Sequence, residues 1–315
     1  MGKKLNNLAV FTGNANPKLA KEICGYLGIE LSKVAVSRFN DGEVRVKIKQ
    51  NIRGHDVYVI QPTCPPANEH TMELLILIDA LRRASAERIT AVIPYYGYAR
   101  QDRKDQPRVP ITAKLIANLL TVAGANRIIT VDLHAGQIQG FFDIPADNLY
   151  AINVFVDRIK SLKLKNLVIV SPDVGGIKMT RAYSKRLRAP LAIVDKRRIS
   201  DKETAVINIM GEVKGKNVII IDDMITTGSS LVEAISALKN AGSKDIYAAI
   251  THPVLVGPAI DRLKKTPLKK LFVTDTVPVK KEKIMDKIKV LSIAPLLGEA
   301  IKRTHNGESI SILFD

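Results

Sequence analysis

The most specific chemistry in this 315-residue chain is offered by an acidic pair that precedes a hydroxyl-rich turn. Asp222 and Asp223 come shortly before residues 226–230, which read Thr-Thr-Gly-Ser-Ser. Hydroxyl and backbone N–H groups at the beginning of a helix favour a bound phosphate. Paired carboxylates accept hydrogen bonds from a ribose diol or hold Mg²⁺ through water. The string therefore predicts a ribose 5-phosphate site, whereas the acidic pair alone would indicate only a strand end before an ordinary helix cap.

Other polar side chains also follow predicted strands. Taken singly, each has a simpler interpretation: a solvated loop, a structural histidine or a surface turn. Functional residues in parallel sheets gather at the carboxyl ends of the strands, so their common position favours a shared site. Guanidinium and ammonium groups there would clamp phosphates, and His134 with Asp173 would offer a nitrogen and a carboxylate to Mg²⁺. The segments concerned are Arg100–Asp105, Asp132 with His134, Asp173 and Lys196–Arg198.

The elements that would position these residues alternate between strand and helix along the whole chain. Val218–Ile221 is a β-branched run typical of a strand buried on both faces, and it is predicted to end there, before the acidic pair. The alternation begins at Leu8 and is repeated from Leu167, which predicts an α/β protein of two similar, doubly wound domains with mainly parallel sheets. At about 150 residues per domain, we expect domains at residues 1–150 and 151–315, the last segment packing back on the first. Predicted elements include helices Pro17–Leu27 and Thr71–Arg83 and strands Leu8–Thr12 and Ala192–Val194.

The composition indicates a soluble globular protein with a basic surface. Lys and Arg number 48 against 31 Asp and Glu, which gives a formal net charge of +17. Nucleic acid is one partner that such a charge suggests, but few aromatic residues separate the Lys clusters, so we expect no nucleic acid partner. The chain has no apolar run long enough for a membrane span, no apolar signal-peptide core at its start and no P-loop string. Its two cysteines lack metal or redox spacing, which favours a reduced, cytoplasmic setting.

Further strings in both halves of the chain extend the argument. They are Arg38–Glu43, Tyr98–Asp102, Asp132–Ala135, Gln137–Asp143, Ser171–Asp173, Gly175–Gly176, Asp195–Arg198 and Arg303–Ser309. Through these strings, in this order, the chain resembles the ribose-phosphate pyrophosphokinase family over nearly its full length.

The resemblance implies a phosphoribosyltransferase-like fold and a defined reaction. The β,γ-diphosphoryl group of MgATP would pass to the 1-hydroxyl of ribose 5-phosphate, giving phosphoribosyl diphosphate and AMP. Mg²⁺ would be the cofactor, inorganic phosphate an activator, and the protein a homo-oligomer, expected to be a hexamer. A phosphoribosyltransferase is the nearest alternative, but it would leave Arg100–Asp105 without a role. A non-catalytic regulator on the same fold would not need Lys196, Arg198 and His134 together.

The resemblance also implies roles for individual residues. Lys196 and Arg198 would stabilise charge on the transferring group, and a neighbouring subunit would supply the adenine site. The expected ATP ligands are Phe39, Asp41, Gly42, Glu43, Arg100, Gln101, Asp102, Lys104 and His134. The expected ribose 5-phosphate ligands are Arg198, Asp222, Asp223, Thr226, Thr227, Gly228, Ser229 and Ser230, and the metal ligands are His134 and Asp173. The positions that match a phosphate effector site are Arg53, Ser85, Gln139, Ser309 and Ser311.

The chain departs from the pattern of the family in two places. Many members carry Asp where it has Thr226 and Gly-Thr where it has Ser229–Ser230, changes that concern sugar affinity. Gln106–Pro107 stands in a loop where phosphate-regulated members often carry basic or serine residues. Because Gln106 is uncharged and Pro107 has no backbone donor, we expect a weakened response to phosphate.

Overall fold

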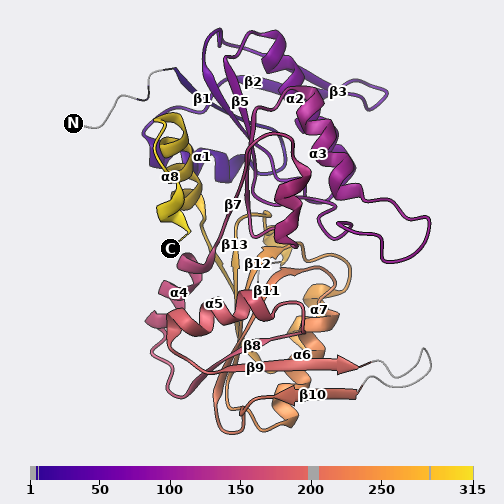
Figure 1. The fold of residues 1–315 in the computed structure, drawn as a ribbon, viewed down its shortest axis with the longest axis vertical. Helices are drawn as coiled ribbons and strands as arrows, with labels where there is room; N and C mark the ends of the chain where they lie inside the picture. Colours follow the sequence, from indigo (N-terminus) through magenta and orange to yellow (C-terminus); the bar gives the residue numbers. More distant parts are fainter. Residues whose placement is uncertain (1–4, 6, 198–205, 284, 315) are drawn as a thin grey trace. The chain divides into compact units, whose positions relative to one another are not determined.

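The computed structural model describes residue 5 and residues 7–197, 206–283 and 285–314. The chain forms two compact units (Figure 1). Unit 1 comprises residues 1–150, 276–278 and 292–315, and unit 2 comprises residues 151–275 and 279–291. The chain therefore leaves unit 1 after Tyr150 and returns to it for its last segment. Among the described residues, no helix is long and apolar enough to cross a membrane.

The core of unit 1 is a parallel sheet. Its five strands, in spatial order, are β1 (Leu8–Thr12), β4 (Asp56–Ile60), β5 (Arg88–Ile93), β6 (Arg127–Val131) and β7 (Ala146–Leu149). β4 is buried along its whole length, as expected for a parallel strand that is covered on both faces. The carboxyl ends of these strands consequently lie at one edge of the sheet.

The helices of unit 1 have sequence signals at their ends and apolar faces toward the sheet. They are α1 (Pro17–Leu27), α2 (Ala67–Arg83), α3 (Thr112–Ala123), α8 (Ala294–His305) and the 3-10 turns η1 (Gly136–Phe141) and η3 (Ser311–Leu313). The Asn16 side chain accepts a hydrogen bond from the Leu19 N–H at the start of α1, and Gly28 ends the helix with a left-handed φ of 68°. Leu74, Leu77, Ile78 and Leu81 of α2 recur at helical spacing and lie in the core.

The C-terminal helix is attached to unit 1 by a buried charged group. α8 packs against α1, and His305 Nδ1 lies 2.8 Å from the Asp56 carboxylate at the start of β4. Arg88 Nε donates to the same carboxylate at 2.8 Å. Burial opposes ionisation of Asp56, but the hydrogen bonds from Arg88 and His305 outweigh it and lower the pKa of Asp56.

An antiparallel ribbon, β2 (Val34–Arg38) and β3 (Val44–Ile48), stands apart from the main sheet of unit 1. Its side chains alternate between two faces. Val36, Val46 and Ile48 pack against the core of unit 1, whereas Arg45 and Lys47 are exposed. The ribbon therefore has one anchored face and one free face.

Unit 2 contains a larger sheet of the same kind. Its seven strands, in spatial order, are β10 (Val206–Met210), β9 (Leu191–Arg197), β8 (Leu167–Ser171), β11 (Asn217–Ile225), β12 (Ile246–Pro253), β13 (Leu268–Thr274) and β14 (Ile288–Leu291). Only β10 is antiparallel to its neighbour. The helices are α4 (Ile152–Ser161), α5 (Ile177–Leu187), α6 (Ser229–Asn240), α7 (Ala259–Lys264) and the 3-10 turn η2 (Lys281–Lys283).

The two units share a strand order. The row β1-β4-β5-β6-β7 in unit 1 corresponds to β8-β11-β12-β13-β14 in unit 2. In each unit an antiparallel pair, β2–β3 or β9–β10, lies in the chain between the first two strands of the row. The predicted fold class, α/β with two similar, mainly parallel sheets, is confirmed.

One predicted strand boundary was wrong. β11 does not end at Ile221 but continues to Ile225. Its pairing with β8 stops at Ile220, whereas its pairing with β12 continues to Ile225. The acidic pair therefore lies inside the strand, where only one side of the strand has a partner. The tertiary pairing, which the local sequence does not display, extends the strand.

Candidate active site

A cavity of about 310 Å³ in unit 1 brings the predicted ATP loop together with His134. The loop follows β5, and His134 follows β6, the next strand of the sheet. Lys104, a further predicted ATP ligand, is exposed and does not line this cavity. The polar residues around the cavity include Arg100, Gln101, Asp102, Arg103, His134 and Gln137. The guanidinium groups of Arg100 and Arg103 line the same cavity, and such a pair suits a bound polyphosphate.

Hydrogen bonds hold this loop at Gln101 and Asp102. The Gln101 N–H donates to the Tyr98 carbonyl at 2.9 Å, and the Ala113 N–H donates to the Gln101 carbonyl at 3.1 Å. Gln137 donates to the Asp102 carboxylate at 3.0 Å, which ties the segment after β6 to the loop. These hydrogen bonds tie the loop to α3 and to the segment after β6.

The tip of the β2–β3 ribbon carries the residues predicted to bind adenine. Phe39 is 49% exposed, and Asp41, Gly42 and Glu43 are exposed as well. The Phe39 N–H donates to the Glu43 carbonyl at 2.8 Å, and the Gly42 N–H donates to the Phe39 carbonyl at 3.0 Å. Gly42 has a φ of 95°, a conformation that a residue with a Cβ rarely adopts. The tip thus presents an aromatic ring on a compact turn.

In unit 2, three carboxylates lie near one another: Asp173 follows β8, and Asp222 and Asp223 lie in β11, just beyond its pairing with β8. Burial and the neighbouring Asp223 and Asp173 carboxylates raise the pKa of the half-buried Asp222 well above its usual range. Asp173 is exposed, and its Oδ1 accepts a hydrogen bond from the Gly176 N–H at 2.9 Å. This cluster is rich in hydrogen-bond acceptors, and hydroxyl donors or a cation would reduce the repulsion between its carboxylates.

The hydroxyl-rich turn lies at the beginning of α6, immediately after β11. Gly228 precedes the helix with a left-handed φ of 76°, and the hydroxyls of Thr227 and Ser229 lie 2.9 Å apart. Within the part of the chain that the structure describes, no side chain caps α6. Its first N–H groups are therefore available to an anion. Thr226 and Ser230 complete the turn, half-buried and exposed respectively.

α7 and the segment before it support this turn. The Val256 N–H donates to the Thr226 carbonyl at 3.0 Å, and Arg262 Nη1 donates to the Thr227 carbonyl at 3.0 Å. Arg262 was not among the predicted residues. No local pattern marks it, because its contact depends on the packing of α7 beside α6.

The two predicted metal ligands belong to different units. His134 lies in unit 1 and Asp173 in unit 2, so their pairing on one ion stays a prediction. Mg²⁺ prefers oxygen ligands and keeps several waters. The carboxylates of Asp173, Asp222 and Asp223 offer such oxygens, but among the described residues no group of three or more acidic, histidine or cysteine side chains converges to hold one ion.

Of the two predicted catalytic residues, Lys196 belongs to a strand. The backbone of Lys196 belongs to β9, where it pairs with Ile207 of β10. Arg198 lies outside the described residues.

The predicted effector residues all belong to unit 1. The Gly54 N–H, next to Arg53, donates to the Ser85 carbonyl at 3.0 Å. Ser309 and Ser311 form a second pair, with their hydroxyl oxygens 3.0 Å apart. Gln139 lies in η1 and donates to the Gly136 carbonyl at 3.0 Å. The structure thus shows two local pairs and a separate glutamine.

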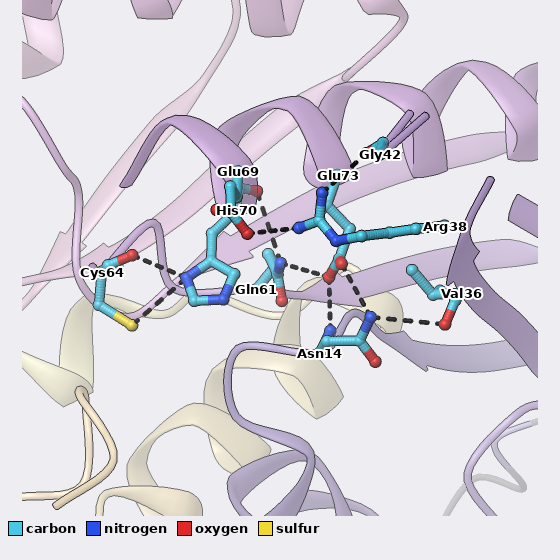
Figure 2. Close-up of polar contacts among 9 residues, drawn as sticks. All are labelled: Asn14, Val36, Arg38, Gly42, Gln61, Cys64, Glu69, His70 and Glu73. Carbon is cyan, nitrogen blue, oxygen red and sulfur yellow. Dashed lines mark hydrogen bonds and ion pairs between the residues drawn. The ribbon is translucent and has the colours of Figure 1, made fainter. Parts of the chain in front are cut away.

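A buried carboxylate in unit 1 stands where unit 2 has its acidic cluster. Glu73 of α2 is 4% exposed and accepts hydrogen bonds from Asn14, which follows β1, and from Gln61, which follows β4 (Figure 2). The distances are 2.9 Å from Asn14 Nδ2 and 2.7 Å from Gln61 Nε2. A Cβ at Gly13 would lie 2.4 Å from the Glu73 carboxylate, so a side chain at this position would clash with the network. Sequence reasoning missed Glu73, which looks like a surface residue of an amphipathic helix.

Comparisons with known proteins agree along the chain. The N-terminal domain of ribose phosphate pyrophosphokinase matches residues 8–124, and the phosphoribosyl synthetase-associated domain matches residues 195–315. Ribose-phosphate pyrophosphokinases of Thermosipho africanus and Bacillus caldolyticus are 55% and 54% identical to this chain, each alignment covering 98% of both proteins. A crystal structure of phosphoribosylpyrophosphate synthetase from Mycobacterium smegmatis is similar with a TM-score of 0.91 and 40% identity, covering 96% of this chain and 100% of that one.

Proposed function

Since this chain belongs to the ribose-phosphate pyrophosphokinase family, and so makes phosphoribosyl diphosphate and AMP from ATP and ribose 5-phosphate, we propose that its two units divide the substrates. Unit 1 binds ATP through the loop that follows β5. Unit 2 binds ribose 5-phosphate through the end of β11 and the beginning of α6. The observation that carries this assignment is the acidic pair beside a helix start that no described side chain caps.

In unit 2, each part of the sugar phosphate meets a group of suitable chemistry. Asp222 and Asp223 accept hydrogen bonds from the 2′- and 3′-hydroxyls of the ribose. The 5-phosphate is held by the hydroxyls of Thr227 and Ser229 and by the first N–H groups of α6, with the contributions of Thr226, Gly228 and Ser230. The raised pKa of Asp222 supports this assignment, because hydroxyl donors stabilise the ionised form of a carboxyl group that has other carboxylates beside it.

In unit 1, Arg100 and Gln101 contact the phosphates of ATP, and Asp102, Lys104 and His134 complete this side of the site. The cavity of about 310 Å³ supports the assignment, and so do the guanidinium groups around it. Phe39 stacks on the adenine, with Asp41, Gly42 and Glu43 beside it, in a site that a neighbouring subunit completes.

Mg²⁺ would bind the phosphates of ATP, with Asp173 and His134 as the proposed protein ligands. The ion would supply positive charge that neutralises the diphosphoryl group. Lys196 and Arg198 stabilise the same charge. The C1 oxygen of the sugar bonds to the β-phosphorus, the bond from the β-phosphorus to the oxygen that it shares with the α-phosphorus breaks, and AMP leaves. Positioning and charge neutralisation supply most of the catalysis in such a transfer.

We further propose a homo-oligomer, a hexamer, in the cytoplasm, whose activation by inorganic phosphate is present but weak. Arg53 supplies a bidentate phosphate donor, and Ser85, Gln139, Ser309 and Ser311 supply uncharged ones. A phosphate titration in phosphate-free organic buffer, with the mass of the assembly measured in parallel, tests this point. Full activity without phosphate, unchanged on its addition, would remove the effector site.

The reaction itself is tested by incubating the protein with ATP, Mg²⁺ and ribose 5-phosphate and separating the nucleotides. We expect AMP, formed only when both ribose 5-phosphate and Mg²⁺ are present. ADP as the nucleotide product would mean a simple kinase instead.

The role of Lys196 is tested by Lys196→Ala. Removal of a preorganised donor to transition-state charge lowers kcat by about 10²–10³-fold, with the KM values largely kept. A change confined to KM would make Lys196 a ground-state binder.

A further inference from the structure

The free face of the β2–β3 ribbon carries an aromatic ring and a guanidinium group in contact. The guanidinium carbon of Arg45 lies 5.4 Å from the centroid of the Phe39 ring, within the range of a cation–π interaction. Arg45 projects from β3 on the face opposite to Val46, which packs on the core. One face of the Phe39 ring is therefore covered by charge while the residue remains 49% exposed.

The backbone under this pair is fixed by a second arginine, on the anchored face of the ribbon. Arg38 Nη1 donates to the Gly42 carbonyl at 3.0 Å, and its Nη2 forms an ion pair with Glu69 of α2 (Figure 2). The Glu43 N–H donates to the Asp41 carboxylate at 3.1 Å, which closes the turn. The backbone of the tip is thus held to α2, and the main freedom left at Phe39 is the rotation of its side chain.

We propose that Arg45 is a positioning residue for the base of ATP, acting through Phe39. This inference rests on the proposed function, in which the Phe39 ring stacks on adenine. The guanidinium group holds the ring in one rotamer and occupies one of its faces, so the other face is presented to the base. The Phe39 side chain therefore loses little freedom when the base stacks on it, which lowers the entropic cost of binding ATP.

A different role for the same residue is a simple electrostatic one. An exposed cation attracts the phosphates of ATP from a distance, whatever the position of Phe39. Lys47 offers a matched control for that effect, since it is an exposed cation on the same face of the same strand, two residues further along.

The experiment compares Arg45→Ala, Lys47→Ala, Phe39→Ala and the double variant Phe39→Ala/Arg45→Ala in steady-state assays with ATP and ribose 5-phosphate. A cation–π pair at an exposed site corresponds to about a two- to fivefold effect, so we expect Arg45→Ala to raise the KM for ATP by about that factor. The kcat and the KM for ribose 5-phosphate should stay the same, Arg45→Lys should restore part of the loss, and Lys47→Ala should have no effect. In the Phe39→Ala background, removal of Arg45 should change nothing further.

Two outcomes overturn the inference while leaving the adenine site intact. One is an effect of Arg45→Ala no larger than that of Lys47→Ala, when Phe39→Ala alone weakens ATP binding. The other is an effect of Arg45→Ala that persists in the Phe39→Ala background, which would assign it to charge alone. If Phe39→Ala leaves the KM for ATP unchanged, the proposed stacking on Phe39 fails and the role of Arg45 fails with it.

Discussion

The ends of the first two strands of each parallel row hold carboxylates in opposite situations. In unit 1, after β1 and β4, the buried Glu73 receives hydrogen bonds from the amides of Asn14 and Gln61. In unit 2, after β8 and in β11 just beyond its pairing with β8, Asp222 faces the carboxylates of Asp173 and Asp223. One position has its acceptors satisfied by the protein, and the other has an excess of acceptors.

One strand order thus serves structure in one unit and, in the proposed function, binding in the other. A buried carboxylate that accepts hydrogen bonds from several donors stabilises the fold. Clustered carboxylates with a raised pKa cost stability in the free protein, and that cost is offset when a diol or a cation arrives. Four measurements on three substitutions test this contrast.

The largest effect is expected for Asp222→Asn on activity. Two hydrogen bonds from sugar hydroxyls to a charged acceptor, at about 1.5–3 kcal/mol each, correspond to a loss of roughly a hundredfold or more in kcat/KM for ribose 5-phosphate. The KM for ATP should change little, because unit 1 is untouched. Asp261→Asn, an exposed aspartate of α7 in the same unit, is the control. Near-normal activity of Asp222→Asn would show that the acidic cluster is not the sugar site.

The second effect is a loss of stability for Glu73→Gln. The amide oxygen could still accept from the Asn14 N–H and Gln61 Nε2, but the amide NH₂ would then face Asn14 Nδ2, so this donor loses its acceptor and both residues lose a charged partner. We expect the free energy of unfolding of unit 1 to fall by about 1.5–3 kcal/mol, measured by denaturant unfolding. Glu69→Gln removes an exposed ion pair one turn earlier on α2 and should cost about 0–1 kcal/mol. Equal losses in the two variants would contradict the structural role of Glu73.

The third effect concerns one hydroxyl of the turn. Ser229→Ala removes one hydroxyl donor to the charged 5-phosphate, a hydrogen bond worth about 1.5–3 kcal/mol, so the KM for ribose 5-phosphate should rise roughly ten- to hundredfold. Ser236→Ala, on an exposed part of the same helix where the hydroxyl donates to the Val232 carbonyl, should leave that KM unchanged. An unchanged KM in Ser229→Ala would leave phosphate binding to the backbone N–H groups and the remaining hydroxyls.

The smallest expected effect is a gain in stability, rather than a loss, for Asp222→Asn in the absence of ligands. The pKa of Asp222 is higher in the folded protein than the ordinary aspartate pKa of about 4 that it has in the unfolded chain. As the pH rises above about 4, ionisation of this group therefore favours the unfolded state. The variant should therefore be more stable than the parent protein near pH 7, and its advantage should shrink as the pH falls toward 4. Thermal unfolding at several pH values measures this difference, and a variant less stable than the parent near pH 7 would refute it.

The local sequence was sufficient where spacing and caps decide the structure. α1 occupies Pro17–Leu27 as predicted, since Asn16 and Gly28 mark both ends. The helix predicted at Thr71–Arg83 begins earlier, at Ala67. The strand predicted at Ala192–Val194 became β9, Leu191–Arg197, because its pairing with β10 adds residues at its carboxyl end. The predicted strand boundaries were wrong where pairing with a neighbouring strand, rather than residue type, set the length of the strand.

The candidate site divides in the same way. The residues of the ATP loop, His134 and the hydroxyl-rich turn could be named from type and order alone. That Arg103 and Gln137 share a cavity with them, that Arg262 holds the turn and that Arg45 covers Phe39 could not. Each of these contacts joins segments whose separation is fixed by packing or by strand register.

The sequence by itself determined the α/β alternation, the family and the chemistry of the acidic pair, because hydrophobic period and residue type act locally. Only the tertiary structure decided which carboxylates are satisfied. Glu73 and Asp222 carry the same functional group, yet amide donors brought by Asn14 and Gln61 stabilise one, and neighbouring carboxylates destabilise the other. The free energy of a buried charge depends on the groups within a few ångströms of it, and the fold brings those groups together from distant parts of the chain.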